Sequence, residues 1–294
     1  MQNVHGILIL VAAMLGFTLE DMFIKSLSAT VPVGQILMAL GLGSGAVFAV
    51  LALLRGDKLF APAAWSPRML LRSACEAGGA VLFATALSRV DLSTVAAVFQ
   101  TLPLVITLGA ALFLGEQVGW RRLTAILIGF SGVLLIIRPG TDAFDPNALL
   151  VLGAVLAVAL RDLITRTIDA SVSSFVVSFQ SFASLVLAGP FLMLFDAADY
   201  ATLTSGNLTM IAGAVAFGAA GYWGVVTALR LGEASVVAPF RYSRLLFSIL
   251  VGMVAFGERP DLPTILGATL IIGSGLFTFM REHRLAKTTA PLQA

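Results

Sequence analysis

The sequence predicts an all-α integral membrane protein in which ten transmembrane helices form two inverted five-helix repeats around a central cavity. Composition and an internal repeat both point to this fold class. Of the 294 residues, 59% are hydrophobic and 12% are charged, with a mean hydropathy of +0.98. Soluble domains carry about twice that share of charge. Since a span needs roughly 20 apolar residues, ten spans would take about 200 residues and leave only short loops.

Apolar runs between charged or Gly/Pro-containing breaks define the ten predicted spans. Turn signals such as Arg138-Pro139-Gly140 and Glu258-Arg259-Pro260 mark several breaks. The first run follows no Lys or Arg and is longer than the core of a signal peptide, so we expect it to remain as the first span. The spans are expected near 4–25, 33–54, 69–88, 93–114, 122–138, 147–168, 173–195, 207–229, 235–256 and 262–280.

The distribution of basic residues predicts that both termini lie in the cytoplasm and that the protein sits in the cytoplasmic (inner) membrane. Cytoplasmic loops are expected to be rich in Lys and Arg. With cytoplasmic termini, those loops carry Arg55, Lys58, Arg68, Arg72, Arg121, Arg122, Arg166, Arg230, Arg281, Arg284 and Lys287. The opposite loops carry only Lys25, Arg89, Arg138 and Arg259. Orientation in a membrane therefore explains the net charge of +2 better than a nucleic-acid partner does.

The two halves of the chain resemble each other. At an offset of 142, residues 86–134 align without gaps on residues 228–276, and Gly115-Glu116 meets Gly257-Glu258. At an offset of 141, Leu19, Asp21 and Lys25 meet Leu160, Asp162 and Arg166. Apolar residues match by chance, but composition does not supply a paired Gly-Glu. An odd number of spans per half forces the second repeat to be inverted. We expect repeats at 1–140 and 141–282, followed by a cytoplasmic tail at 283–294.

The motifs Leu114-Gly115-Glu116 and Phe256-Gly257-Glu258 each end a fourth span and precede a span rich in small residues. These motifs are the most specific part of a resemblance to the EamA-type exporters of the drug/metabolite transporter superfamily. The resemblance covers nearly the whole chain. Within that superfamily it is most similar to YddG-type exporters of aromatic amino acids. The resemblance implies ten helices around a central cavity and export of small metabolites by alternating access.

Ionisable residues inside spans are candidate functional residues because each costs several kcal/mol unless it is paired or hydrated. Those near the two ends of the bundle are candidates for gates that open in turn. The alternative is that Lys25 and Arg161 extend to the membrane surface and that the acidic residues form static pairs. The gating candidates are Glu20, Asp21 and Lys25 toward the outer face, and Arg161, Asp162 and Arg241 toward the cytoplasm.

Arg244 is the leading candidate for substrate binding because it lies too deep in its span to reach the membrane surface. Its guanidinium could bind a carboxylate through two hydrogen bonds, and Tyr242 could contact an amino acid. A structural pair between Arg244 and Glu76 is the alternative, and most of the aromatic candidates could equally be packing residues. The remaining candidates are Gln100, Phe99, Phe179, Tyr222, Trp223 and Glu76.

Several functional classes are excluded or disfavoured. No P-loop is present, so we expect no ATP-driven transport. His5 and His283 lie near the termini and Cys75 is the sole cysteine, so we expect no metal and no cofactor. An intramembrane enzyme lacks a nucleophile with a base, and a channel lacks a repeated ring of ligands. Nucleosides or organic cations remain alternative solutes, and proton coupling through Glu20, Asp21 or Glu76 remains open beside uniport. We expect a monomer in the lipid bilayer.

Overall fold

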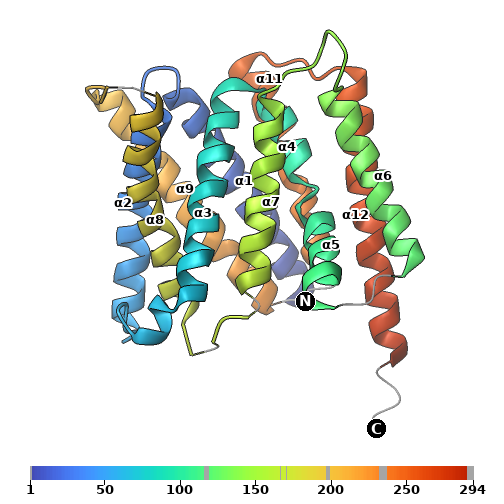
Figure 1. Ribbon diagram of the computed structural model, residues 1–294, viewed down its shortest axis with the longest axis horizontal. Coiled ribbons are helices and arrows are strands. Elements are labelled where there is room, and N and C mark those ends of the chain that lie inside the picture. The colour runs from blue at the N-terminus through green and yellow to red at the C-terminus, as the bar shows by residue number, and fades with distance from the viewer. Residues whose placement is uncertain are drawn as a thin grey trace.

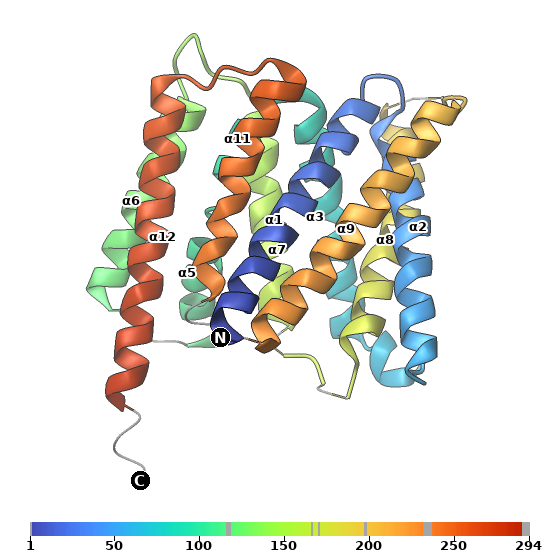
Figure 2. The same ribbon diagram turned by 180° about the vertical axis from the view of Figure 1, so that it is seen from behind.

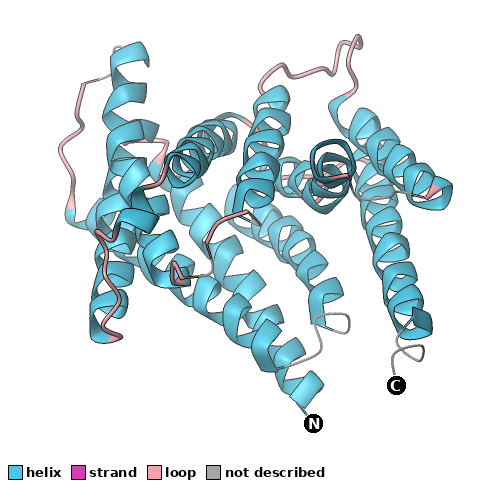
Figure 3. Cartoon of the chain, turned by 60° about the horizontal axis from the view of Figure 1, so that its bottom comes forward, coloured by secondary structure: helices cyan, strands magenta, loops and turns pink. Residues whose placement is uncertain are grey.

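The computed structural model describes residues 2–115, 119–165, 167–169, 171–196, 199–231 and 237–289. These residues form helices and loops without a strand (Figure 3). Their order along the chain (Figure 1) is α1 (Gln2–Leu27), α2 (Val33–Leu54), η1 (Pro62–Trp65), α3 (Pro67–Arg89), α4 (Leu92–Phe99), α5 (Leu102–Leu114), α6 (Trp120–Ile137), α7 (Ala148–Thr165), α8 (Ser174–Asp196), α9 (Ser205–Leu231), η2 (Ala238–Tyr242), α11 (Ser243–Phe256) and α12 (Leu262–Thr289).

This architecture confirms a multi-pass helical membrane protein. Among the described residues, nine segments are long and apolar enough to cross a membrane, and residues 123–137 of α6 form a shorter apolar helix. Successive segments alternate in direction, so α1 begins and α12 ends at the same end of the bundle (Figures 1 and 2). The last helix continues to Thr289, past the predicted end of its span at 280.

The packing repeats with the sequence. Helix α1 packs along α9 (Figure 2) in the way that α7 packs along α3, while α2 pairs with α8 and α6 with α12. A side chain on Gly79 of α3 would meet Val158 of α7, and one on Gly221 of α9 would meet Phe17 of α1. Both glycines therefore allow close helix approach at equivalent places. The two Gly-Glu motifs also match in conformation, because Gly115 and Gly257 end α5 and α11 with φ of 70° and 67°.

Two predicted spans, 93–114 and 235–256, are not continuous α-helices. The first is divided into α4 and α5, and the second contains the 3-10 turn η2 before α11. Pro103 and Pro239 lie at these breaks, where a missing N–H cannot complete a helical ladder. The breaks lie close together, since Gln100 Nε2 donates to the Arg241 carbonyl at 3.5 Å. Broken helices near a bundle centre are typical of transporter binding sites.

The largest apolar core closes the end of the bundle where α1 finishes. Leu27, Val31, Leu87, Val90 and Leu92, from the end of α1 and the α3–α4 turn, are all less than 10% exposed and belong to one cluster. Ile137 and Ala148, at the adjoining ends of α6 and α7, extend it. Dense packing holds this end together independently of the charged groups.

Candidate functional site

Arg244 forms the centre of a compact cluster contributed by four helices. Its Nη2 donates to Asp21 Oδ2 at 2.6 Å, which joins α11 to α1. The guanidinium carbon also lies 5.3 Å from the ring centroid of Phe17 and 5.9 Å from those of Phe83 and Phe99. Phe83 and Phe99 meet edge to face with centroids 4.8 Å apart. We call these five residues the Arg244 site.

The Arg244 site combines a buried ion pair with an aromatic surround. The Asp21 side chain is 4% exposed, whereas that of Arg244 is 20% exposed. Of the guanidinium nitrogens, only Nη2 donates to Asp21. The other N–H groups of Arg244 could therefore donate to the carboxylate of a solute. The alternative partner predicted for Arg244, Glu76, is wrong, because Glu76 lies in another cluster. Arg244 pairs instead with Asp21, which the sequence predicts to be a gate residue.

Glu76 belongs to a second charged cluster between α3 and α7. Arg161 Nη1 donates to both Glu76 oxygens at 2.9 and 3.0 Å, and its Nη2 lies 2.7 Å from Asp162. Arg72 approaches Glu76 at 3.5 Å and extends the cluster by donating to Thr165 and to Ser181 of α8. Arg72 was counted among the loop residues, but it lies within α3 and is 7% exposed. Its spacing of four from Glu76 was the signal that could have revealed it.

Glu258, from one of the Gly-Glu motifs, ties the end of the α11 segment to the start of α4. Its carboxylate accepts hydrogen bonds from Leu92 N at 2.6 Å, Ser93 N at 3.0 Å and Ser93 Oγ at 2.8 Å. Lys25 Nζ lies 3.7 Å from the same carboxylate and also donates to the carbonyls of Leu87 and Val90. A carboxylate here caps the free N–H groups at the helix start. We call Glu258, Ser93 and Lys25 the Glu258 clasp. The equivalent Glu116 lies outside the described residues.

Three of the predicted substrate contacts point away from the Arg244 site. The Tyr242 hydroxyl lies against Gly275 of α12. Phe179 meets Phe60 of the α2–α3 loop with centroids 6.5 Å apart. Trp223 is 60% exposed, on the opposite side of α9 from the glycines that contact α1.

Other predicted residues lie near one or both of the charged clusters. Gln100 binds the Arg241 carbonyl, and the Arg241 side chain is exposed and within electrostatic range of Asp162, Arg161 and Arg244. Tyr222 of α9 packs edge to face on Phe48, with centroids 5.0 Å apart, and lies within electrostatic range of Arg72. Glu20 lies against Gly218 of α9.

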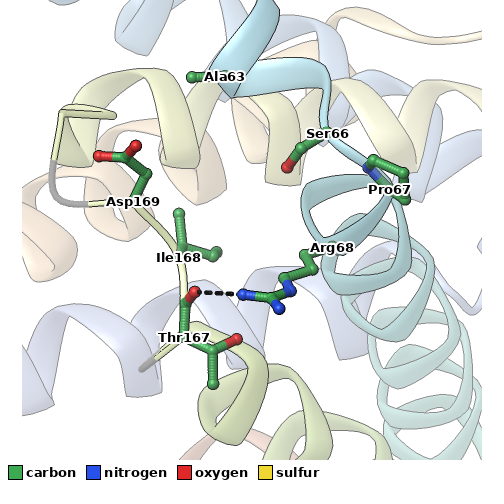
Figure 4. Close-up of a pocket in the computed structure, with 7 residues that line it drawn as sticks. All are labelled: Ala63, Ser66, Pro67, Arg68, Thr167, Ile168 and Asp169. Carbon is green, nitrogen blue, oxygen red and sulfur yellow. Dashed lines mark hydrogen bonds between the residues drawn. The ribbon is translucent and has the colours of Figure 1, made fainter.

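A cavity of about 390 Å³ lies apart from these clusters, between η1, the start of α3 and the α7–α8 loop (Figure 4). Arg68 extends into it and donates to the Thr167 carbonyl at 3.4 Å. None of its lining residues is a predicted site residue. Within the described residues, no group of three His, Cys, Asp or Glu side chains could hold a metal ion.

Helical repeats that meet through partly buried ion pairs, with broken helices at their junction, are typical of secondary transporters. The chain belongs to the EamA-like transporter family of the drug/metabolite transporter superfamily, whose profile matches it twice, over residues 4–138 and 146–280. The double match supports the two repeats.

Curated relatives are also transporters, which agrees with the prediction that the chain is not an enzyme. A riboflavin transporter of Vibrio cholerae is 31% identical over 65% of this chain and 63% of its own length, so the match spans less than two thirds of that relative. An S-adenosylmethionine uptake transporter of Rickettsia felis is 28% identical over 65% of this chain and 64% of its own. The pseudopaline exporter CntI of Pseudomonas aeruginosa is 26% identical over 91% and 93%.

One solved crystal structure has the same fold, with a TM-score of 0.61 and 20% sequence identity. The alignment covers 93% of this chain and 98% of that one. Together these findings confirm the superfamily and its EamA-like branch. They do not support the narrower expectation of a YddG-type amino-acid exporter. The relatives' names state different solutes and different directions of transport. The substrate is therefore inferred from the chemistry of the site.

Proposed function

We propose that this protein carries small organic solutes that bear a carboxylate and a planar ring, with aromatic amino acids as the predicted substrates and export as the predicted direction. The observation that carries this proposal is the Arg244 guanidinium, held by Asp21 at 2.6 Å and surrounded by Phe17, Phe83 and Phe99. We also propose, from the distribution of basic residues, that both termini lie in the cytoplasm.

The chemistry of the Arg244 site suits such a solute. A guanidinium binds a carboxylate through parallel hydrogen bonds, and it stacks on aromatic faces. The three phenyl rings also offer faces and edges to a planar solute. S-Adenosylmethionine, the solute named for one relative, joins an amino-acid group to a planar purine, so it fits the same description. Riboflavin, named for another, offers the ring without the carboxylate.

Alternating access would require the two ends of the bundle to open in turn. The Glu258 clasp joins the repeats at the end where α1 finishes, and the Arg161–Glu76 contact joins them through α7 and α3. Because α1 and α7 run in opposite directions (Figure 1), Asp21 and Asp162 lie in opposite halves of the bundle. Interactions that break at one end and form at the other give the bistable element that transport needs.

Counterflow in proteoliposomes tests the proposal. Vesicles loaded with tryptophan should take up labelled tryptophan or phenylalanine, and S-adenosylmethionine should compete, whereas adenosine and a quaternary ammonium ion should not. Arg244→Gln should lower carboxylate transport at least ~30-fold, because loss of one partner of a desolvated charge pair costs about 2–5 kcal/mol. The matched control is Arg259→Gln, at an exposed loop position. Wild-type transport restricted to solutes without a carboxylate, or an Arg244→Gln variant with full activity, would refute the proposal.

A further inference from the structure

The two repeats place a pair of unlike residues at equivalent interfaces. The offset of 141 between α1 and α7 puts Glu20 at the position of Arg161, and the offset of 142 between α3 and α9 puts Gly218 at the position of Glu76. The packing supports this alignment at two further positions. A side chain on Gly79 would contact Val158 and Ala154, and one on Gly221 would contact Phe17 and Ala13. In both cases the partners differ by 141.

The charges at these equivalent interfaces are not equivalent. Where α7 meets α3, Arg161 and Glu76 form a pair at 2.9 Å. Where α1 meets α9, the Glu20 carboxyl group lies against Gly218, and it is the group that any side chain at that position would meet first. No hydrogen bond or ion pair joins Glu20 to another residue in the part of the chain that the structure describes. The carboxylate at the α1–α9 interface therefore lacks a cationic partner within the described residues, whereas Glu76 at the α3–α7 interface is paired with Arg161.

The unpaired carboxylate lies next to the Arg244 site. Phe17, Glu20 and Asp21 share one face of α1, because they are three and four residues apart. Phe17 contacts both Gly221 of α9 and the Arg244 guanidinium, so it connects the two places. Glu20 itself lies within electrostatic range of Arg244 and Asp21. The nearest guanidinium is committed to Asp21 at 2.6 Å.

We propose that Glu20, whose carboxyl group lies in the space left by Gly218, binds the ammonium group of the transported solute, while Arg244 binds its carboxylate. This inference rests on the proposed function and narrows it to zwitterionic solutes, the α-amino acids and their derivatives. A solute ammonium would complete at the α1–α9 interface the ion pair that Arg161 and Glu76 form at the α3–α7 interface. The Glu20 subsite would thus favour an amino acid over a neutral ring compound or a simple carboxylic acid.

The test compares each amino acid with its deaminated analogue, which keeps the ring and the carboxylate. Tryptophan is paired with indole-3-propionate and phenylalanine with 3-phenylpropionate, as competitors of counterflow in proteoliposomes. The wild type should prefer each amino acid about tenfold or more. Glu20→Gln should lose that preference by weakening only the amino acid, and Glu20→Asp should retain part of it. Asp142→Asn, at an exposed loop position, is the control.

The outcomes separate this inference from the function on which it rests. If wild type recognises neither member of a pair, the proposed function fails. If it recognises both equally, or if Glu20→Gln keeps the preference, only the ammonium subsite fails. Unchanged competition by indole-3-propionate shows that Glu20→Gln is folded and active. If Glu20 is instead a proton carrier, its Gln variant would lose the response to a pH gradient while keeping the preference, and the subsite would be overturned.

Discussion

At the scale of residues, several charged groups in the described part of the chain bind across helices, in addition to the pairs Arg72–Glu76 and Arg161–Asp162 that lie within one helix. Asp21 and Arg244 are 223 positions apart, and Glu258 binds residues 166 and 165 positions away. Such pairs contribute little net stability relative to apolar packing, but removal of one partner leaves a buried charge uncompensated. Their value here is that each pair fixes which helices meet.

Glu258 gives the clearest prediction at this scale. Glu258→Ala should destabilise the protein by about 3–5 kcal/mol, because it leaves Lys25 without a carboxylate and two N–H groups at the start of α4 without an acceptor. Thermal unfolding of the detergent-purified protein would show a lower midpoint. Asp199→Ala, at an exposed loop position, should unfold as wild type does. Equal midpoints for the two variants would mean that the clasp is not structural.

The sequence was least informative about which individual side chains lie together. Arg244, Asp21 and Phe99 could each be named from depth in a span or aromatic character, but their association could not, because it depends on how α1, α4 and α11 pack. Phe17 and Phe83 had the same aromatic character as Phe99, but only the packing of α1 and α3 shows that they lie beside Arg244. Tyr242 and Trp223 had the right chemistry, yet Tyr242 lies against α12 and Trp223 lies on the exposed side of α9.

At the scale of elements, hydropathy predicted ten segments but not the breaks within two of them. The run from 93 to 114 is apolar apart from a few Ser, Thr and Gln residues, so its overall composition does not reveal that the chain leaves the helix at Gln100. Pro103 and Pro239 were visible in the sequence, but proline is tolerated in the first turn of a helix and within transmembrane helices. The breaks bring Gln100 and Arg241 together, which neither span alone would do.

The contact between the α6 end and the start of α12 predicts a pH dependence. Hydrogen bonds from Arg138 and Thr264 lower the pKa of Asp261 to about 2 from 3.8. Ionised Asp261 therefore stabilises the fold above pH ~4, and this stabilisation disappears as pH falls toward ~2. Asp261 is solvent-exposed, so Asp261→Asn should cost only about 0.5–1.5 kcal/mol at pH 6. The difference in melting midpoint between the two proteins should shrink in acid. A difference that stays constant down to pH 2.5 would contradict this assignment.

At the scale of the whole molecule, symmetry and asymmetry have separate roles. The repeated packing of α1 on α9 and of α7 on α3 would allow two exchangeable arrangements under the proposed mechanism, as inverted repeats do in secondary transporters. The side chains then make the two interfaces chemically different, with Arg161 and Glu76 at one and Glu20 and Gly218 at the other. The fold class could be predicted because composition and repeat average over many residues. The pairing of charged groups at these interfaces could not, because it depends on these few differences.

A reversible cross-link tests whether the end closed by the Glu258 clasp opens during transport. Asp91 and Arg259 are exposed and each adjoins a clasp contact, between Leu92 and Glu258. In a Cys75→Ser background, Asp91→Cys with Arg259→Cys should lose transport when bridged by a short bis-methanethiosulfonate and regain it with reductant, because both repeats would be fixed at that end. A pair within one loop, Asp142→Cys with Asp145→Cys, should react without losing transport. Full transport by the bridged protein would show that this end stays closed throughout the cycle, and alternating access would then fail for this chain.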